Sequence, residues 1–195
     1  MTEQEFKEFI ELKFNKVLKE EEYSFLYKYI IKGKNESEIL PAQYKKVEDF
    51  YKEHKDTENI KIMIQKIKNQ GKDKAEFNID KKYEPVSFLK FYYLILKNIK
   101  NRPVNTCYYC GVSEDTCKEF CEKRPEGFNK RHRGFVLEIE KKDPRKGYNK
   151  ENCDLACYIC NNAKSDLFTE EEFRENIVPQ IEKFWENFRK KSFSN

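Results

Sequence analysis

Two Cys-x-x-Cys pairs are the residues of this chain most suited to chemistry. Cys107 and Cys110 form the first pair, followed at once by Gly111, and Cys157 and Cys160 form the second. Each such turn presents two thiolates to one ion, and two turns complete the tetrahedral ligand set of a closed zinc site. We therefore expect one structural Zn²⁺ ion, held by Cys107, Cys110, Cys157 and Cys160.

The other readings of the cysteines are weaker. All four could be unpaired buried thiols, whereas redox activity is disfavoured because neither pair follows a strand in a βαβ pattern. Cys117 and Cys121 lie four residues apart, on one face of a short helix that Ser113 opens. They could reach a second metal, but only Cys153 lies near enough in sequence to join them, so we expect small buried hydrophobic side chains.

Between the two pairs, the sequence predicts a strand, a loop, a second strand and a helix. Residues 135–140, FVLEIE, alternate, so Phe135, Leu137 and Ile139 should be buried while the carboxylates of Glu138 and Glu140 emerge together on the other face. The loop is KKDPRKGY, the second strand is NCDLA, and CNNAKSD begins the helix.

This order, tied by a zinc knuckle, resembles the HNH endonucleases of the ββα-metal class. The signature of their zinc-bound subtype runs from Cys-x-x-Cys-Gly through Asp-His-x-x-Pro and Glu-Asn to Cys-x-x-Cys-(His or Asn)-x-x-Lys. The resemblance covers about residues 105 to 170. Besides the cysteines, the matching residues are Glu151, Asn152, Asn161 and Lys164.

The resemblance implies an active site, with one departure. Aligning Pro144 with the family proline places Glu140 at the metal-binding aspartate and Lys141 at the general-base histidine. Glutamate keeps a hard oxygen ligand for Mg²⁺ or Mn²⁺. Lysine is no equivalent base, since lowering its pKa from about 10.4 to near 7 would cost roughly 4 to 5 kcal/mol. In the family, Asn152 would orient the base and pin the loop, and Asn161 would complete the metal shell; either asparagine could instead cap a turn or helix.

Three outcomes of the lysine substitution stay open. A metal-bound water could be acidic enough with help from Glu138. Lys141 could stay charged and stabilise the transition state, with the base supplied from elsewhere. Catalysis could also be lost.

Basic residues gather in the same segment. Between Lys123 and Lys150 there are ten Lys or Arg against four acidic residues, which indicates a polyanion contact, although solvated lysines are the alternative. We expect phosphate contacts, within the resemblance, from Arg131, Arg133, Lys142, Arg145, Lys146, Lys150 and Lys164.

The leading hypothesis is an HNH-type endonuclease that hydrolyses phosphodiesters in DNA, with one divalent ion at Glu140 and Asn161. The resemblance suggests a restriction, phage-defence or mobile-element context. The second hypothesis is a catalytically inactive, zinc-dependent nucleic-acid-binding module. A third makes the zinc unit a clamp for a protein partner or a second copy, bound through aromatic-rich N-terminal helices.

The elements that position these residues are mainly helical. Apolar residues recur at helical spacing over residues 2–32, 44–51, 57–70 and 88–99, with a connecting loop at 71–84 and His54 on a solvated face. Near the C-terminus, Thr169 begins a capping box, and Pro179 should kink the helix that follows. We expect a mainly α fold: an N-terminal helical bundle over 1–102, then a small α+β zinc-bound ββα-metal (HNH) module with a C-terminal helix over 103–195.

Composition adds a few limits. The 195 residues are 38% hydrophobic and 15% aromatic, with only 6 Pro and 6 Gly, which argues against a disordered chain. Residues 1–14 lack the features of a signal peptide. The most apolar window, residues 86–99, is too short to span a bilayer. We therefore expect a cytoplasmic protein with no membrane partner, in which seven cysteines serve as metal ligands and buried thiols.

Overall fold

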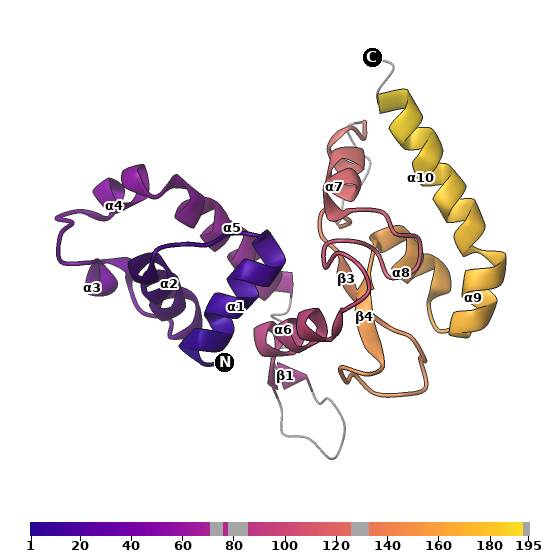
Figure 1. Cartoon of the computed structure of the whole chain (residues 1–195), viewed down its shortest axis with the longest axis horizontal. Coiled ribbons are helices and arrows are strands. Elements are labelled where there is room, and N and C mark those ends of the chain that lie inside the picture. Colours follow the sequence, from indigo (N-terminus) through magenta and orange to yellow (C-terminus); the bar gives the residue numbers. More distant parts are fainter. Residues whose placement is uncertain (71–75, 78–85, 126–132, 193–195) are drawn as a thin grey trace. The chain divides into compact units, whose positions relative to one another are not determined.

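The computed structural model describes residues 1–70, 76–77, 86–125 and 133–192. It divides into two compact units (Figure 1). The first consists of Met1–Phe77 and Pro85–Leu96, and the second is built mainly from Lys97–Asn195. The sequence expectation placed the boundary six residues later, before Pro103, where the helical period stops.

The first unit begins with two helices over the stretch where one or two were expected. Helix α1, Glu3–Phe14, starts with a capping box in which Thr2 and Glu5 satisfy each other's backbone N–H groups. Asn15 ends it in the left-handed conformation. Helix α2, Glu20–Leu26, continues into a π-helical turn, η1, Tyr27–Ile31.

The rest of the first unit is also helical. Helices α3, α4, α5 and α6 span Glu36–Ile39, Val47–Glu53, Lys55–Gln70 and Phe88–Asn98. Helix α3 buries no residue. The apolar faces of the other three meet α1 and α2 in a core of mostly aromatic and branched side chains, which includes Phe6, Phe9, Phe25, Phe50, Ile64 and Phe91.

Two expectations for this unit are wrong. His54 is buried rather than solvated, because its Nδ1 lies 2.6 Å from Glu22 Oε1 and its Nε2 lies 2.8 Å from the Tyr44 hydroxyl. Within the expected loop at 71–84, the structure describes only Glu76–Phe77, and these residues form a short strand, β1, which pairs antiparallel with β2, Val86–Ser87. The rest of that expected loop lies outside the described residues. A two-residue strand is too short to show a hydrophobic period.

The second unit contains the predicted strand, loop, strand and helix. Strand β3, Glu138–Lys141, pairs antiparallel with β4, Cys153–Ala156, so that Glu138 lies opposite Ala156 and Lys141 opposite Cys153. Helix α8, Tyr158–Lys164, follows β4 almost directly. Strand β3 begins three residues later than the alternation predicted.

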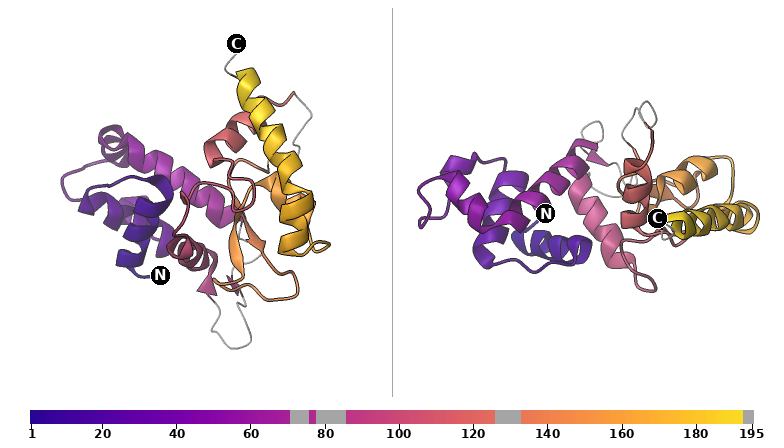
Figure 2. Two further views of the ribbon diagram at one scale, coloured as in Figure 1. Left: turned by 45° about the vertical axis from the view of Figure 1, so that its right-hand side comes forward. Right: turned by 90° about the horizontal axis from the view of Figure 1, so that it is seen from above.

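Three more helices enclose this core. Helix α7, Glu114–Glu122, starts at the predicted cap Ser113. The capping box of Thr169 and Glu172 opens α9, Glu170–Asn176, as predicted. The kink expected at Pro179 is instead a break: α9 ends, and a separate helix α10, Val178–Ser192, leaves at an angle with Pro179 in its first turn (Figure 2).

Helix α10 packs beside α7, as both views show (Figures 1 and 2). The contact is aromatic: the Phe120 ring meets those of Phe184, Trp185 and Phe188 edge-on, with centroids 5.3 to 5.5 Å apart. Among the residues that the structure describes, no helix combines the length and the hydrophobicity that a membrane crossing requires.

Candidate metal centre and active site

The first cysteine pair sits in a tight hydrogen-bonded turn. Gly111 N donates to Cys107 O at 3.0 Å, and Cys107 N donates to Val112 O at 2.8 Å. The turn requires a left-handed residue after Cys110, and Gly111 supplies it with φ of 66°. Tyr108 N donates to Leu155 O at 2.8 Å, which fixes the turn to β4.

The second pair opens helix α8 and completes a four-sulfur cluster. Cys157 is the N-cap residue, and its sulfur accepts a hydrogen bond from Cys160 N at 3.4 Å. The Sγ atoms of Cys107, Cys110, Cys157 and Cys160 all lie within 4.8 Å of one another. Cys110 Sγ and Cys157 Sγ are 3.8 Å apart, and sulfurs bound to zinc at about 2.3 Å in a tetrahedron lie roughly that far apart.

The electrostatics of the cluster call for a cation. Hydrogen bonds from Cys110, Cys157 and Cys160 lower the pKa of Cys107 far below its usual value. The ionised Cys107 in turn raises the pKa of the other three thiols. Only a bound cation lets all four ionise together, so the donor set fits structural zinc.

Two of the three remaining cysteines are buried, as expected. Cys117 and Cys153 are buried and Cys121 is partly buried. Within the described ranges, they do not join any second group of three or more metal-ligating side chains. They are small packing residues.

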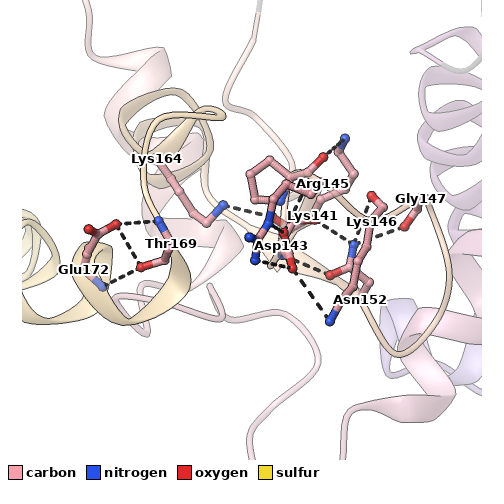
Figure 3. Close-up of polar contacts among 10 residues, drawn as sticks. Lys141, Asp143, Arg145, Lys146, Gly147, Asn152, Lys164, Thr169 and Glu172 are labelled. Carbon is pink, nitrogen blue, oxygen red and sulfur yellow. Dashed lines mark hydrogen bonds and ion pairs between the residues drawn. The ribbon is translucent and has the colours of Figure 1, made fainter.

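Glu140 and Lys164 form a buried ion pair, which corrects two expectations. Lys164 Nζ lies 3.1 Å from Glu140 Oε1 and donates to Lys141 O at 3.0 Å. Figure 3 shows the Lys164 side chain reaching from its helix toward Lys141. The side chain of Lys164 is 0% exposed and that of Glu140 is 7% exposed. Glu140 therefore does not reach the solvent, and Lys164 is not available to a phosphate. Burial raises the pKa of Glu140 although Lys164 opposes it.

Glu138 lies on the same face of β3 as Glu140, and it contacts Asn161, which is one turn before Lys164 in α8. Asn161 Nδ2 donates to Glu138 Oε2 at 2.6 Å. Arg133 donates from Nε to Oε1 at 3.0 Å and from Nη2 to Oε2 at 2.6 Å, and its guanidinium stacks 4.7 Å from the Tyr158 ring centroid. Asn161 therefore lies against Glu138, and the contact partner of Glu140 is Lys164.

Lys141 is occupied by its own loop. Its ammonium donates to Pro144 O at 3.0 Å and lies 5.3 Å from the centroid of the Tyr148 ring. Because side chains alternate along a strand, Lys141 projects from the face of β3 opposite to Glu138 and Glu140.

Asn152 pins the loop between the strands. Its Oδ1 accepts from Asp143 N at 3.0 Å, and its Nδ2 donates to the carbonyl oxygens of Asp143, Lys146 and Gly147 at 3.0, 3.4 and 3.1 Å. The side chain is buried inside the loop (Figure 3). Its contacts are those of a structural pin.

Replacing Asn152 with alanine is expected to destabilise the second unit by about 2 to 3 kcal/mol, because several loop groups lose a buried hydrogen-bond partner. Chemical denaturation followed by Trp185 fluorescence measures the change. Asn162→Ala is the matched control, since Asn162 is exposed and makes one hydrogen bond, to Tyr158 O; its effect should stay within about 0.5 kcal/mol. Equal effects of the two changes would contradict the pinning role.

Three of the predicted phosphate contacts, Lys142, Arg145 and Lys146, line a cleft of about 1000 Å³ between this loop and the start of α9. Arg145 and Lys146 are exposed and lie beside Asp143, at 3.0 and 3.7 Å. Hydrogen bonds from Arg145 lower the pKa of Asp143 to about 2. Lys142 lies over the Tyr108 ring, and Lys150 is exposed and does not line the cleft. Arg131 lies outside the described residues.

Sequence reasoning missed the role of Arg133 as the partner of Glu138, and that of Glu114. The Glu114 carboxylate is buried and accepts a hydrogen bond from Leu137 N at 2.7 Å. This bond holds the residue that immediately precedes β3. Only its position in the first turn of α7 distinguished it in the sequence. The spacing of Arg133 and Glu138 gave no signal, because five residues separate them across a turn.

Comparisons with known proteins are sparse. No protein-family model and no curated protein matches the chain. Among solved structures, the chain is similar to the rare-cutting HNH restriction endonuclease PacI, with 24% identity, a TM-score of 0.41, and coverage of 65% of this chain and 78% of that one. A likeness of this extent does not assign a function.

Proposed function

We propose that the protein is a zinc-stabilised HNH-type endonuclease that hydrolyses phosphodiester bonds in DNA, in a restriction, phage-defence or mobile-element context. One observation carries the proposal. Directly beside the four-sulfur cluster, the Asn161 amide of α8 lies 2.6 Å from a carboxylate of β3, that of Glu138. The resemblance implies such a pairing between Glu140 and Asn161; a carboxylate and an amide brought together by a strand and this helix support the proposal with Glu138 in the place of Glu140.

The divalent ion belongs, in this proposal, at Glu138 and Asn161 rather than at Glu140 and Asn161. Lys164 already neutralises Glu140. Mg²⁺ and similar ions are usually held by one or two carboxylates, with waters and substrate phosphates as the other ligands, so a single carboxylate and an amide oxygen fit. A half-turn of the Asn161 amide would exchange its nitrogen for its oxygen.

A divalent ion bound there would supply positive charge to the scissile phosphate and acidify water. Lys142, Arg145 and Lys146 line the cleft, whose lining includes neither Glu138 nor Asn161, so in this proposal they hold phosphates of the strand away from the scissile one. Lys141 donates to Pro144 O and projects from the face of β3 opposite to Glu138, so it is not positioned as the base at this site. In this proposal the Glu138 carboxylate orients the attacking water and accepts its proton.

Plasmid cleavage by the zinc-loaded protein in Mg²⁺ or Mn²⁺ tests the function. Glu138→Gln is expected to lower the rate about 100-fold or more, because it removes the charge that would hold the ion. Glu140→Gln tests whether Glu140 is the metal-binding carboxylate, as the resemblance implies. Glu182→Gln, at an exposed residue of α10 that does not line the cleft, is the control and should cleave normally. The absence of metal-dependent cleavage by the unaltered, zinc-loaded chain would sink the proposal.

A second function, a non-catalytic nucleic-acid-binding module, is favoured by one observation. Both residues aligned with the family's catalytic dyad are engaged elsewhere, Glu140 with Lys164 and Lys141 with Pro144. Salt-dependent DNA binding without cleavage would establish this function. If the zinc-loaded chain neither binds nor cleaves DNA, the clamp for a protein partner or second copy remains.

A further inference from the structure

Both oxygens of the Glu138 carboxylate accept hydrogen bonds from neighbouring side chains. The guanidinium of Arg133 takes both oxygens, at 3.0 and 2.6 Å, and Asn161 Nδ2 takes Oε2 again at 2.6 Å. Such two-point contacts are the strongest hydrogen bonds that a carboxylate makes to a side chain. Stacking on Tyr158, 4.7 Å away, holds the guanidinium in place.

A divalent ion and this guanidinium need the same oxygen atoms. Both are positive, so their repulsion adds to the competition for lone pairs. Occupation of Glu138 by one therefore excludes or strongly weakens the other. The Arg133 side chain is 39% exposed, so an anion in solution can reach it while it holds Glu138.

We propose that Arg133 closes the Glu138–Asn161 site to divalent ions in the free protein, and that a phosphate of a bound strand opens it by taking the guanidinium. The inference rests on the proposed function for the location of the ion. A phosphodiester offers two oxygens in the spacing that the guanidinium fork fits, as a carboxylate does. Arg133 is thus a positioning residue that couples strand binding to ion binding.

The first test is a titration of the full, zinc-loaded chain with Mn²⁺, in which electron paramagnetic resonance counts the free ion. Arg133→Gln is expected to bind Mn²⁺ roughly tenfold more tightly than the unaltered chain, because the competitor for Glu138 is gone. The added change Glu138→Gln should abolish that gain.

Arg145→Gln is the matched control for the Mn²⁺ titration. Arg145 makes an equivalent two-point contact to a carboxylate, that of Asp143, at 3.0 and 3.1 Å, and its replacement removes the same charge. Arg133→Lys keeps the charge but cannot hold both oxygens, so it should give an intermediate affinity and replaces the glutamine variant if that one does not fold. Equal Mn²⁺ affinity in the Arg133 and Arg145 variants would overturn the proposal.

The second test measures DNA binding without added divalent ions. Glu138→Gln removes the carboxylate that competes with the phosphate for Arg133, so DNA binding should tighten roughly tenfold. Glu182→Gln removes the same charge at an exposed residue of α10 and should change the affinity much less. An affinity of the Glu138 variant no greater than that of the Glu182 variant would contradict the coupling.

The two proposals can fail separately. If the protein cleaves DNA but its Mn²⁺ affinity does not change when Arg133 is replaced, the proposed function stands and the proposed coupling fails. A protein that cleaves nothing, yet gains Mn²⁺ binding at Glu138 when Arg133 is replaced, keeps the coupling and loses the function.

Discussion

Replacing Cys160 with alanine is expected to remove the zinc and unfold the second unit. Structural zinc contributes about 10 to 16 kcal/mol in zinc-finger peptides, as much as the whole stability of an ordinary domain, about 5 to 15 kcal/mol. Cys160 is fully buried and lies in the first turn of α8, the helix that carries Asn161 and Lys164. Without the ion, the turn that carries Cys107 and Cys110 is no longer tied to α8, and the remaining sulfurs are buried without a cation.

The single tryptophan makes this measurement specific. Trp185 is buried in the second unit against Phe120, so its fluorescence reports on that unit alone. Cys160→Ala should contain less than one zinc per chain and show a red-shifted emission at 25 °C. A chelator should give the unaltered chain the same spectrum.

Cys153→Ala is the matched control. Cys153 is as deeply buried as the zinc ligands and lies only a few residues away on β4, but it is not part of the cluster. It should keep one zinc and lose only about 1 kcal/mol of stability. Native tryptophan emission from a zinc-free Cys160→Ala protein would show that the cluster is not what folds this unit.

The zinc cluster was predictable because its signal is local. Each Cys-x-x-Cys turn fixes two sulfurs by its own geometry, and Gly111 marks the left-handed residue that the first turn needs. The caps at Ser113 and Thr169 were visible for the same reason, since a capping residue and its partner lie three residues apart.

The pairing between β3 and α8 was not predictable, because it depends on how far the helix slides along the strand. The alternation of β3 places Glu138 and Glu140 on one face, and the helical period places Asn161 and Lys164 on one face. Sequence gives both faces but not their offset. The resemblance set Glu140 against Asn161, whereas the structure sets Glu138 there and gives Glu140 to Lys164.

Burial of charge was also out of reach. Glu140 and Lys164 lie in charged segments whose sequence predicts exposure to solvent. They are 24 residues apart in the chain, and no local pattern shows that their side chains are in contact. The same holds in the first unit for His54, whose buried partner Glu22 lies on another helix. Such pairs are decided by tertiary packing, which single-residue patterns do not record.

The Lys164–Glu140 pair is expected to be the most costly contact to break after the zinc cluster. Lys164→Met leaves the Glu140 carboxylate buried beside β4 with no cation, and removing one partner of a buried pair costs about 3 to 5 kcal/mol. Denaturation followed by Trp185 fluorescence measures the loss. The double change Glu140→Leu with Lys164→Met should recover most of it, because apolar side chains need no partner.

The pH dependence separates this effect from lost packing. Burial raises the pKa of Glu140, so a folded state without Lys164 favours the protonated acid. The variant should therefore lie closest to the unaltered chain at low pH, and its deficit should grow as pH rises through the folded pKa. Arg145→Met breaks an exposed pair with Asp143 instead and should cost less than about 1 kcal/mol. A Lys164→Met deficit as small as that, or one that does not vary with pH, would mean that Glu140 has access to water.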